Sequence, residues 1–195
     1  MSIYQKFCKE TIDKNGALKS IELDYPENFN FGYDVVDVIA GETPDKKAMV
    51  WCNTENEEHI FTFSDIKKYS DKMANVFKDA GIEKGDRVMV ILKRHYEYWF
   101  AAIALHKIGA VMITATHMLT VSDFVYRFRA AKVKAVICTT QDEVPQKIDT
   151  ALSDAGMSVI KWCVQKDTQG YMNLTEATRK ADENFQRVQT KADDP

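Results

Sequence analysis

The chain has 195 residues, of which 45% are hydrophobic and 28% are charged, and its formal net charge is -3. This length suits one good-sized domain with an appendage at either end, and the composition is average for a globular protein. A negative net charge argues against general binding to nucleic acid or anionic membranes, which need a basic surface. No apolar run approaches the roughly 20 residues of a membrane-spanning helix, so we expect no membrane span. The N-terminus lacks the apolar core of a signal peptide, and we predict a cytoplasmic location.

The cysteines and histidines give no sign of a metal site. Cys8, Cys52, Cys138 and Cys163 form no CxxC pair, and the last three lie in strand-like apolar segments. We therefore expect reduced, buried thiols that pack as small hydrophobic side chains. The histidines are scattered without the spacing of metal ligands, so no metal-binding residue is predicted.

The first third of the chain reads as an arm followed by small elements. Residues 1–33 have weak periodicity and are predicted to form an N-terminal arm. Residues 34–42 have helical spacing, with Asp34 as a plausible N-terminal cap. The apolar stretches 47–53 and 58–63 flank a polar turn and predict a small hairpin.

From Phe63 onward, helices and strands are expected to alternate. The first helix, 63–81, has Ser64 as its expected cap and Gly81 at its left-handed end. Later helices are expected at 96–109, at 122–133 with Thr120 and Asp123 in capping-box spacing, and at 144–156. Short, continuously apolar runs between them predict strands that are buried on both faces, at 87–92, 110–114, 134–139 and 158–164. An amphipathic piece is expected at 173–188.

This alternation predicts the fold class. Short connections between helices and buried strands are explained by parallel strands joined through crossover helices. We therefore expect an α/β protein with a three-layer, mostly parallel sheet of the Rossmann-like or flavodoxin-like type, carrying the arm and the small hairpin. Two parts are predicted: the arm 1–33 and an α/β portion 34–195.

Ligands of such sheets meet the loops beyond the carboxyl ends of the strands. These loops begin at Lys93, Thr114 and Thr139, and their polar side chains could hold an anion together with the helix starts that follow. Each loop taken alone is more often purely structural. The sequence contains no GxGxxG, GxxxxGK[ST] or GxSxG motif, so no catalytic residue is predicted.

Several segments taken together resemble one family. "FTFSDIKKYSDKMANVFKDAGIEKGDRVMVIL" and "ALHKIGAVMITATHMLTVSDFVYRFRAAKVKAVICT" are similar to the early part of the adenylate-forming (AMP-dependent) acyl-CoA synthetases and ligases. The wording "ATHMLT" and "FNFGYDVVD" resembles the acetyl- and medium-chain acyl-CoA synthetase branch. One departure is that "MITATH" lacks the proline that many relatives carry after this strand.

The resemblance implies a two-step ligase reaction in the full-length parent. A carboxylic acid attacks the α-phosphate of ATP, which gives an acyl-adenylate and pyrophosphate, and the coenzyme A thiol then displaces AMP. ATP, Mg²⁺ and coenzyme A are the implied cofactors and substrates. The Ser/Thr/Gly-rich phosphate-binding loop and the later family motifs are not found in these 195 residues. We therefore expect an N-terminal fragment that is inactive alone, binds none of these cofactors, and works together with the remainder of its own chain.

Arg94, Thr116 and His117 are the candidates for the border of the acyl or coenzyme A passage, on position alone. Truncation would leave apolar surface open, so self-association is expected. Two other hypotheses stay open: a stand-alone, non-catalytic α/β binding or interaction module, and a divergent flavodoxin-like or regulatory domain. The acyl substrate and its chain length are not predicted.

Overall fold

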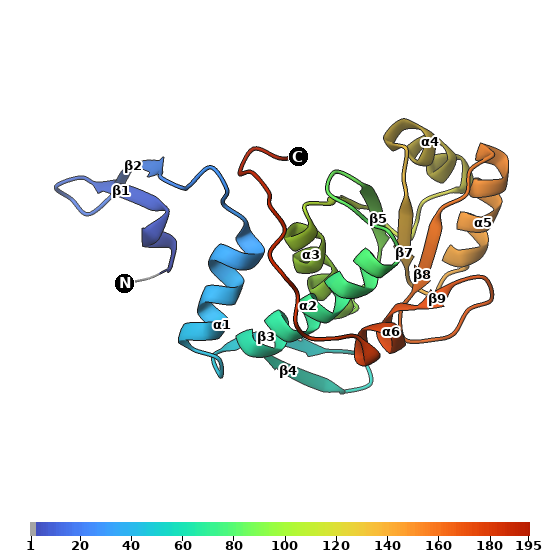
Figure 1. Cartoon of the computed structure of the whole chain (residues 1–195), viewed down its shortest axis with the longest axis horizontal. Coiled ribbons are helices and arrows are strands. Elements are labelled where there is room, and N and C mark those ends of the chain that lie inside the picture. Colours follow the sequence, from blue (N-terminus) through green and yellow to red (C-terminus); the bar gives the residue numbers. More distant parts are fainter. Residues whose placement is uncertain (1–2) are drawn as a thin grey trace.

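The computed structural model describes residues 3–195 and has the predicted fold class (Figure 1). Five parallel strands form the main sheet in the order β6-β5-β7-β8-β9. The strands are β5 (Arg87–Ile91), β6 (Val111–Thr114), β7 (Ala135–Cys138), β8 (Ile160–Cys163) and β9 (Met172–Asn173). The short strand β9 was not predicted.

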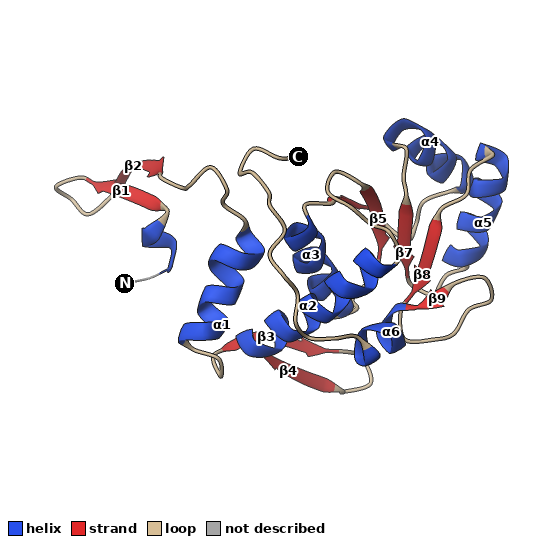
Figure 2. Cartoon of the chain, in the orientation of Figure 1, coloured by secondary structure: helices blue, strands red, loops and turns tan. Residues whose placement is uncertain are grey.

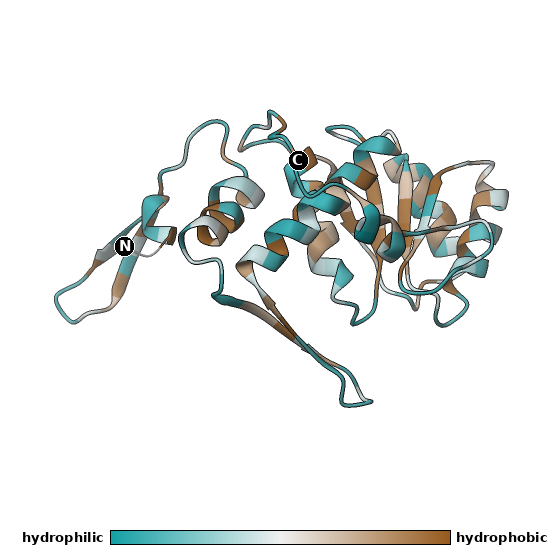
Figure 3. Cartoon of the chain, turned by 60° about the horizontal axis from the view of Figure 1, so that its bottom comes forward, coloured by the Kyte–Doolittle hydropathy of each residue, from teal (hydrophilic) through white to brown (hydrophobic). Residues whose placement is uncertain are grey.

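Helices cover both faces of this sheet, so the molecule has three layers (Figure 2). On one face lie α2 (Phe63–Asp79) and α3 (Glu97–Ile108), and on the other α4 (Val121–Ala131) and α5 (Val144–Ala155). Along β5, Val88 and Val90 pack toward α2 and α3, whereas Met89 and Ile91 pack toward α4 and α5. This alternation explains why the central strand is continuously apolar. Figure 3 shows the hydrophobic strands enclosed by helices whose outer faces are largely hydrophilic.

Strand β6 differs from the prediction because it lies at the edge of the sheet. We expected it to be buried on both faces, but Val111, Met112 and Ile113 are only partly buried and Thr114 is exposed. Its sequence is as apolar as that of β5, so composition alone did not separate an edge strand from a central one.

The helix starts confirm one predicted cap and correct two others. Thr120 and Asp123 form the predicted capping box of α4. In α2 the capping box is made by Thr62 and Asp65 rather than by Ser64, because Phe63 and Ser64 already belong to the helix. The N-terminal helix begins with a π-helical segment, η2 (Gly32–Asp37), and continues as α1 (Val38–Glu42). Asn30, rather than Asp34, accepts the hydrogen bond from the Gly32 amide at this start.

The N-terminal region contains a 3₁₀ turn, η1 (Ile3–Lys6), and a hairpin of β1 (Cys8–Ile12) and β2 (Leu18–Leu23). This hairpin lies apart from the main sheet (Figure 1), and every residue of β2 is exposed. The last residues of the predicted arm differ, because Asn30 and Tyr33 are buried against the body. Met1 and Ser2, which belong to the same prediction, lie outside the described residues. The predicted hairpin of β3 (Lys47–Cys52) and β4 (Glu58–Thr62) is confirmed.

The C-terminal region corrects the predicted amphipathic piece. Helix α6 (Leu174–Lys180) ends early, and residues 181–195 form an extended tail. The Asp182 carboxylate accepts hydrogen bonds from the Asn184 amide and side chain, while the side chain of Asn75 binds the carbonyls of both residues. These local bonds compete with helical ones and hold the backbone extended. The tail then runs alongside η2 (Figure 1).

Two further predictions concern the burial of the cysteine thiols and the absence of a membrane-spanning helix. All four thiols are free; Cys138 and Cys163 are buried as predicted, whereas Cys52 at the end of β3 is exposed. Among residues 3–195, no helix is long and apolar enough to cross a membrane.

Candidate functional site

The carboxyl ends of the strands lie level with one another. Val90 pairs with Thr114, and Ile91 pairs with Cys138, which in turn pairs with Cys163. The loops that follow β5, β6, β7 and β8 therefore leave the sheet along one edge, which we call the carboxyl edge. As in other parallel sheets, this is where a ligand is expected.

A group of charged side chains meets at the carboxyl edge. The Lys93 Nζ, in the loop after β5, lies 2.9 Å from the Asp142 Oδ2 in the loop after β7. The His117 Nε2, in the loop after β6, lies 3.7 Å from the same oxygen. The Lys93 hydrogen bond is the main reason why the pKa of the Asp142 carboxyl is lowered, and the charges of His117 and Lys147 act in the same direction. We call Lys93, His117 and Lys147 the cationic cluster.

A neutral polar pair lies beside this cluster. The His95 Nε2 is 3.0 Å from the Thr139 Oγ1, and Thr139 is fully buried. Burial lowers the pKa of His95, and the charge of Lys93 adds to this effect, so the imidazole is uncharged near neutral pH. The pair joins the loops after β5 and β7 without adding charge to the edge.

Glu97, in the first turn of α3, is a buried carboxyl group behind the same loops. Its side chain accepts hydrogen bonds from the Thr175 Oγ1 at 3.1 Å and the Gln165 Nε2 at 3.5 Å. Burial raises the pKa of Glu97, and these hydrogen bonds oppose the shift only in part. Glu97 therefore ties the start of α3 to the loop after β8 and to α6.

The three residues predicted from the sequence are placed differently. His117 joins the charged group, whereas the exposed Thr116 accepts a hydrogen bond from the Met118 amide in its own loop at 3.3 Å. Arg94 is exposed, and its carbonyl accepts a hydrogen bond from the Trp51 indole. The structure places His117 in the charged group and gives Thr116 a hydrogen bond within its own loop. That Arg94, Thr116 and His117 border an acyl or coenzyme A passage stays a prediction.

Sequence reasoning missed most of the group. Lys93 and Thr139 were noted only as the residues at strand ends, and Asp142, His95 and Glu97 were not singled out. The strand ends could have drawn attention to Lys93, but no pattern marks Asp142. It has a left-handed backbone, with φ of 55°, without being the glycine or asparagine that signals such a turn.

The aromatic residues near Arg94 form a wall rather than an open pocket. Tyr96 packs against Trp51, His59 and Phe61, with ring centroids 5.2–5.5 Å apart. Phe100 is buried in the core beneath them. This wall fixes the β3–β4 hairpin to the start of α3 and so borders the carboxyl edge.

A cavity of about 330 Å³ lies elsewhere, by the start of β6 and the tail. Its lining includes Phe31, His106 and Met112, together with tail residues from Thr190 onward. The Asn30 side chain in its wall already donates to the His106 carbonyl and to the Thr190 Oγ1. This cavity is far from the strand-end loops along the sheet and contributes nothing to the charged group.

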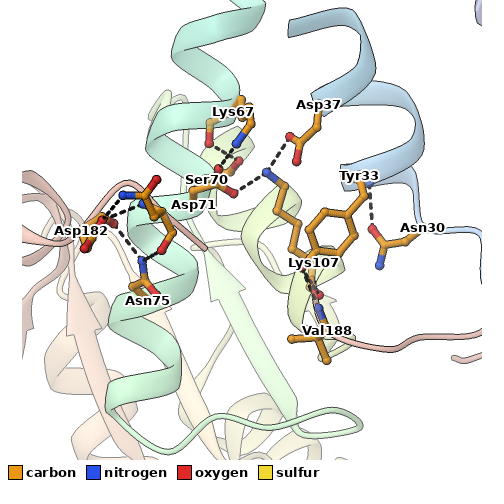
Figure 4. A network of polar contacts seen from close by, with 12 residues as sticks. Asn30, Tyr33, Asp37, Lys67, Ser70, Asp71, Asn75, Lys107, Asp182 and Val188 are labelled. Atoms are coloured by element: carbon orange, nitrogen blue, oxygen red, sulfur yellow. Dashed lines mark hydrogen bonds and ion pairs between the residues drawn. The ribbon is translucent and has the colours of Figure 1, made fainter. Parts of the chain in front are cut away.

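The most deeply buried charge belongs to a second network, between helices (Figure 4). Lys107 of α3 is fully buried, and its Nζ lies 2.6 Å from Asp71 of α2 and 2.7 Å from Asp37 of η2. Lys67 also pairs with Asp71. Burial raises the pKa of Asp37 even though Lys107 opposes the shift. The two lysines and two carboxylates balance in charge, as a buried group of this kind requires.

Tyr33 connects this network to the tail. Its hydroxyl donates to the Lys107 carbonyl and accepts from the Val188 amide, both at 3.1 Å (Figure 4). Arg187 stacks over the same ring and makes two hydrogen bonds to Asp34, at 2.6 and 2.8 Å. The network therefore joins η2, α2, α3 and the tail, and we assign it a structural role.

The described residues limit the chemistry that this chain can perform. Among residues 3–195 there is no group of three His, Cys, Asp or Glu side chains placed to hold a metal ion. The cationic cluster can attract and orient an anion. The Nε2 of the neutral His95 imidazole is already hydrogen-bonded to the Thr139 hydroxyl. The carboxyl edge is therefore suited to binding phosphate or carboxylate groups.

Comparison with known proteins identifies the family. Residues 36–195 match the family "AMP-binding enzyme". Mouse acyl-coenzyme A synthetase ACSM4, mitochondrial, is 33% identical over 98% of this chain and 34% of its own length. Human acyl-coenzyme A synthetase ACSM5, mitochondrial, is 34% identical over 87% of this chain and 30% of its own length. The chain thus spans about a third of the length of these curated relatives.

Solved structures support the same fold. An acyl-CoA synthetase of Brucella canis superposes with a TM-score of 0.73 at 20% identity, covering 85% of this chain and 30% of that one. The anthranilate CoA ligase AuaEII, in complex with anthranoyl-AMP, gives a TM-score of 0.72 at 17% identity, covering 88% of this chain and 32% of that one. At such identities the likeness shows the fold alone. With the family matched over residues 36–195, the chain belongs to the AMP-binding enzymes, and its curated relatives are acyl-CoA synthetases.

Proposed function

We propose that this chain is the N-terminal α/β portion of an AMP-forming acyl-CoA synthetase. The complete protein would convert a carboxylic acid, ATP and coenzyme A into acyl-CoA, AMP and pyrophosphate through an acyl-adenylate. The observation that carries the proposal is the family match over residues 36–195. The acyl-coenzyme A synthetases that match across nearly the whole chain support the same reaction class.

Within that reaction, the chain would help to bind and orient anionic substrates. The cationic cluster can attract the phosphate groups of coenzyme A or ATP, because the attraction between opposite charges is stronger where water is partly excluded. The residues do not fit Mg²⁺, since the described part of the chain has no group of carboxylates placed to hold a metal ion. We therefore assign Mg²⁺ binding to no residue here and derive no step through it.

Adenylation is the direct test of this proposal. The complete protein should catalyse exchange between ATP and pyrophosphate when a carboxylic acid is present, and should form acyl-CoA when coenzyme A is added. The 195-residue chain alone should do neither, because it lacks the glycine-rich loop that would neutralise the triphosphate. Exchange by the 195-residue chain would refute the expected inactivity. A complete protein that forms no acyl-adenylate with any acid would instead favour the non-catalytic binding module.

The predicted border residues can be tested in the complete protein. If Arg94, Thr116 and His117 line the passage, replacing each with alanine should raise the KM for the acid or for coenzyme A. We expect the largest effect for His117, because only this one of the three reaches the charged group. Unchanged KM values for all three variants would identify them as structural residues.

The cytoplasmic location also stays a proposal. It was inferred from the N-terminal sequence alone, while the names of the matched relatives place those proteins in mitochondria. Fractionation of cells that express the complete protein would test it, and recovery in an organelle fraction would contradict it.

A further inference from the structure

Asp142 lies among basic side chains from three different segments. Lys93 comes from the loop after β5, His117 from the loop after β6, and Lys147 from the first turn of α5. Lys93 contacts the Asp142 carboxylate at 2.9 Å, and His117 approaches the same oxygen to 3.7 Å. One carboxylate therefore lies beside a lysine ammonium and an imidazole, with the charge of Lys147 acting on it from α5, and basic groups arranged in this way can bind anions.

This carboxylate is accessible and can be displaced. The side chains of Lys93, Asp142 and His117 are 32%, 45% and 30% exposed, respectively. An ion pair with this much exposure contributes little to stability, because water screens the charges and two side chains must be ordered. A phosphate dianion carries more charge and more acceptor oxygens than a carboxylate, so it can replace Asp142 beside Lys93.

The backbone at this position is strained and exposed. Asp142 and Glu143 both have φ of 55°, a conformation that costs energy for residues other than glycine. Both residues are exposed, and the core resumes only at Val144. Release of the Asp142 side chain therefore uncovers no apolar core.

We propose that the Asp142 carboxylate occupies the position of a substrate phosphate in the cationic cluster and competes with it, so that Asp142 limits the affinity for the phosphate-bearing substrate. This inference rests on the proposed function, because it takes the phosphates of coenzyme A or ATP as the competing groups. Asp142 is a residue that tunes affinity and takes no part in bond making or breaking.

Asp142→Asn in the complete protein tests the inference. Asparagine has nearly the same shape and tolerates a left-handed backbone well, so this variant should fold. Binding of coenzyme A, dephospho-coenzyme A, pantetheine and ATP would be measured by calorimetry. We expect D142N to bind one of the phosphate-bearing probes about five- to tenfold more tightly than wild type, as removal of a like charge at contact distance predicts. The response to each probe shows whether the 3′-phosphate, the diphosphate or the triphosphate competes.

Two further variants control for general charge effects. Asp154→Asn removes the same charge from the far end of α5, where the side chain is exposed and has no polar partner among the described residues, and should leave affinity unchanged. Adding Lys93→Ala to D142N should abolish the gain. Pantetheine, which has no phosphate, should bind all variants alike.

The inference is overturned if D142N binds every phosphate-bearing probe no more tightly than wild type, including the case in which neither binds measurably. It is also overturned if D154N gains as much as D142N. Neither result bears on the proposed function, which is decided separately by adenylation in the complete protein.

Discussion

At the scale of single residues, Lys107 shows how a buried charge can be structural. It is fully buried between Asp71 and Asp37. Removing one partner of such a group leaves the other charges buried without compensation, which costs more than the pair contributes. Lys107→Met should therefore lower the free energy of unfolding by about 3 to 5 kcal/mol, as measured by urea denaturation of the 195-residue chain.

Lys78 provides the matched control for this substitution. It is an exposed lysine in the last turn of α2, so Lys78→Met should change the free energy of unfolding by less than about 0.5 kcal/mol. A Lys107→Met variant as stable as the Lys78→Met variant would show that the network contributes nothing.

Glu97 should give stability a distinct pH dependence. Burial raises its pKa above the ordinary 4.5, so the folded chain retains a proton that the unfolded chain has already released. The free energy of unfolding contributed by Glu97 is therefore highest below the ordinary pKa and falls as pH rises through the folded pKa. Glu97→Gln cannot titrate, so denaturation at a series of pH values should show wild type losing stability relative to E97Q as pH rises.

An exposed glutamate separates this effect from a general change in charge. Glu55 lies in the turn between β3 and β4, and Glu55→Gln should keep the pH dependence of wild type. If E97Q also keeps it, the buried carboxyl group does not titrate as the structure implies.

At the scale of elements, the start of α2 distinguishes two possible caps. The sequence predicts Ser64, whereas in the structure the Thr62 hydroxyl accepts a hydrogen bond from the Asp65 amide. Thr62→Ala should lower the free energy of unfolding by about 1 kcal/mol, because it leaves a helix-terminal amide without its partner. Ser64→Ala should change it by less than about 0.5 kcal/mol. The reverse order in thermal or urea denaturation would restore Ser64 as the cap.

The elements themselves were largely predictable, for a physical reason. The spacing of apolar residues that distinguishes helices from strands is a local property of the sequence. For this reason α2 to α5 and β5 to β8 were found where expected. The end of α6 was not, because Asn75 of α2 binds the backbone at Asp182 and Asn184 from over a hundred residues away. The edge position of β6 depends in the same way on pairing with distant strands.

The candidate site was less predictable than the fold. Strand ends located the loops, and His117 was named among the candidates. The position of Asp142 beside Lys93 depends on two successive residues with left-handed backbone conformation, Asp142 and Glu143. Neither is a glycine or asparagine, the residues that usually indicate such a conformation in a sequence. Polar loops can adopt many conformations of similar energy, so their contacts follow from the assembled sheet rather than from their own residues.

At the scale of the whole molecule, the β1–β2 hairpin is the largest departure from a closed surface. Ile12, Leu18, Ile21 and Leu23 are each more than half exposed. By strand alternation, Ile21 and Leu23 share one face of the hairpin, and Ile12 pairs with Leu18 beyond a register shift. An isolated two-stranded sheet is only marginally stable in water. We therefore expect the 195-residue chain to self-associate, with light scattering showing a mass that rises with concentration.

A pair of lysine substitutions locates the contact. Ile21→Lys places a charge on the apolar face of the hairpin and should reduce association, whereas Ser20→Lys places it on the opposite face and should not. A wild-type chain that stays monomeric at high concentration would refute the expected self-association.

The hydrogen bonds between residues 27–34 and the C-terminal tail have a consequence for how the protein folds during its synthesis. Glu27, Asn30 and Asp34 hold Ala192, Thr190 and Arg187, partners about 160 positions later in the chain. A ribosome releases the chain from its beginning, so Tyr33 emerges 155 residues before Val188, whose amide donates to its hydroxyl. During that interval the surface of η2 and α3 that the tail later covers is exposed to solvent. We expect a chaperone that binds the nascent chain to bind at this surface.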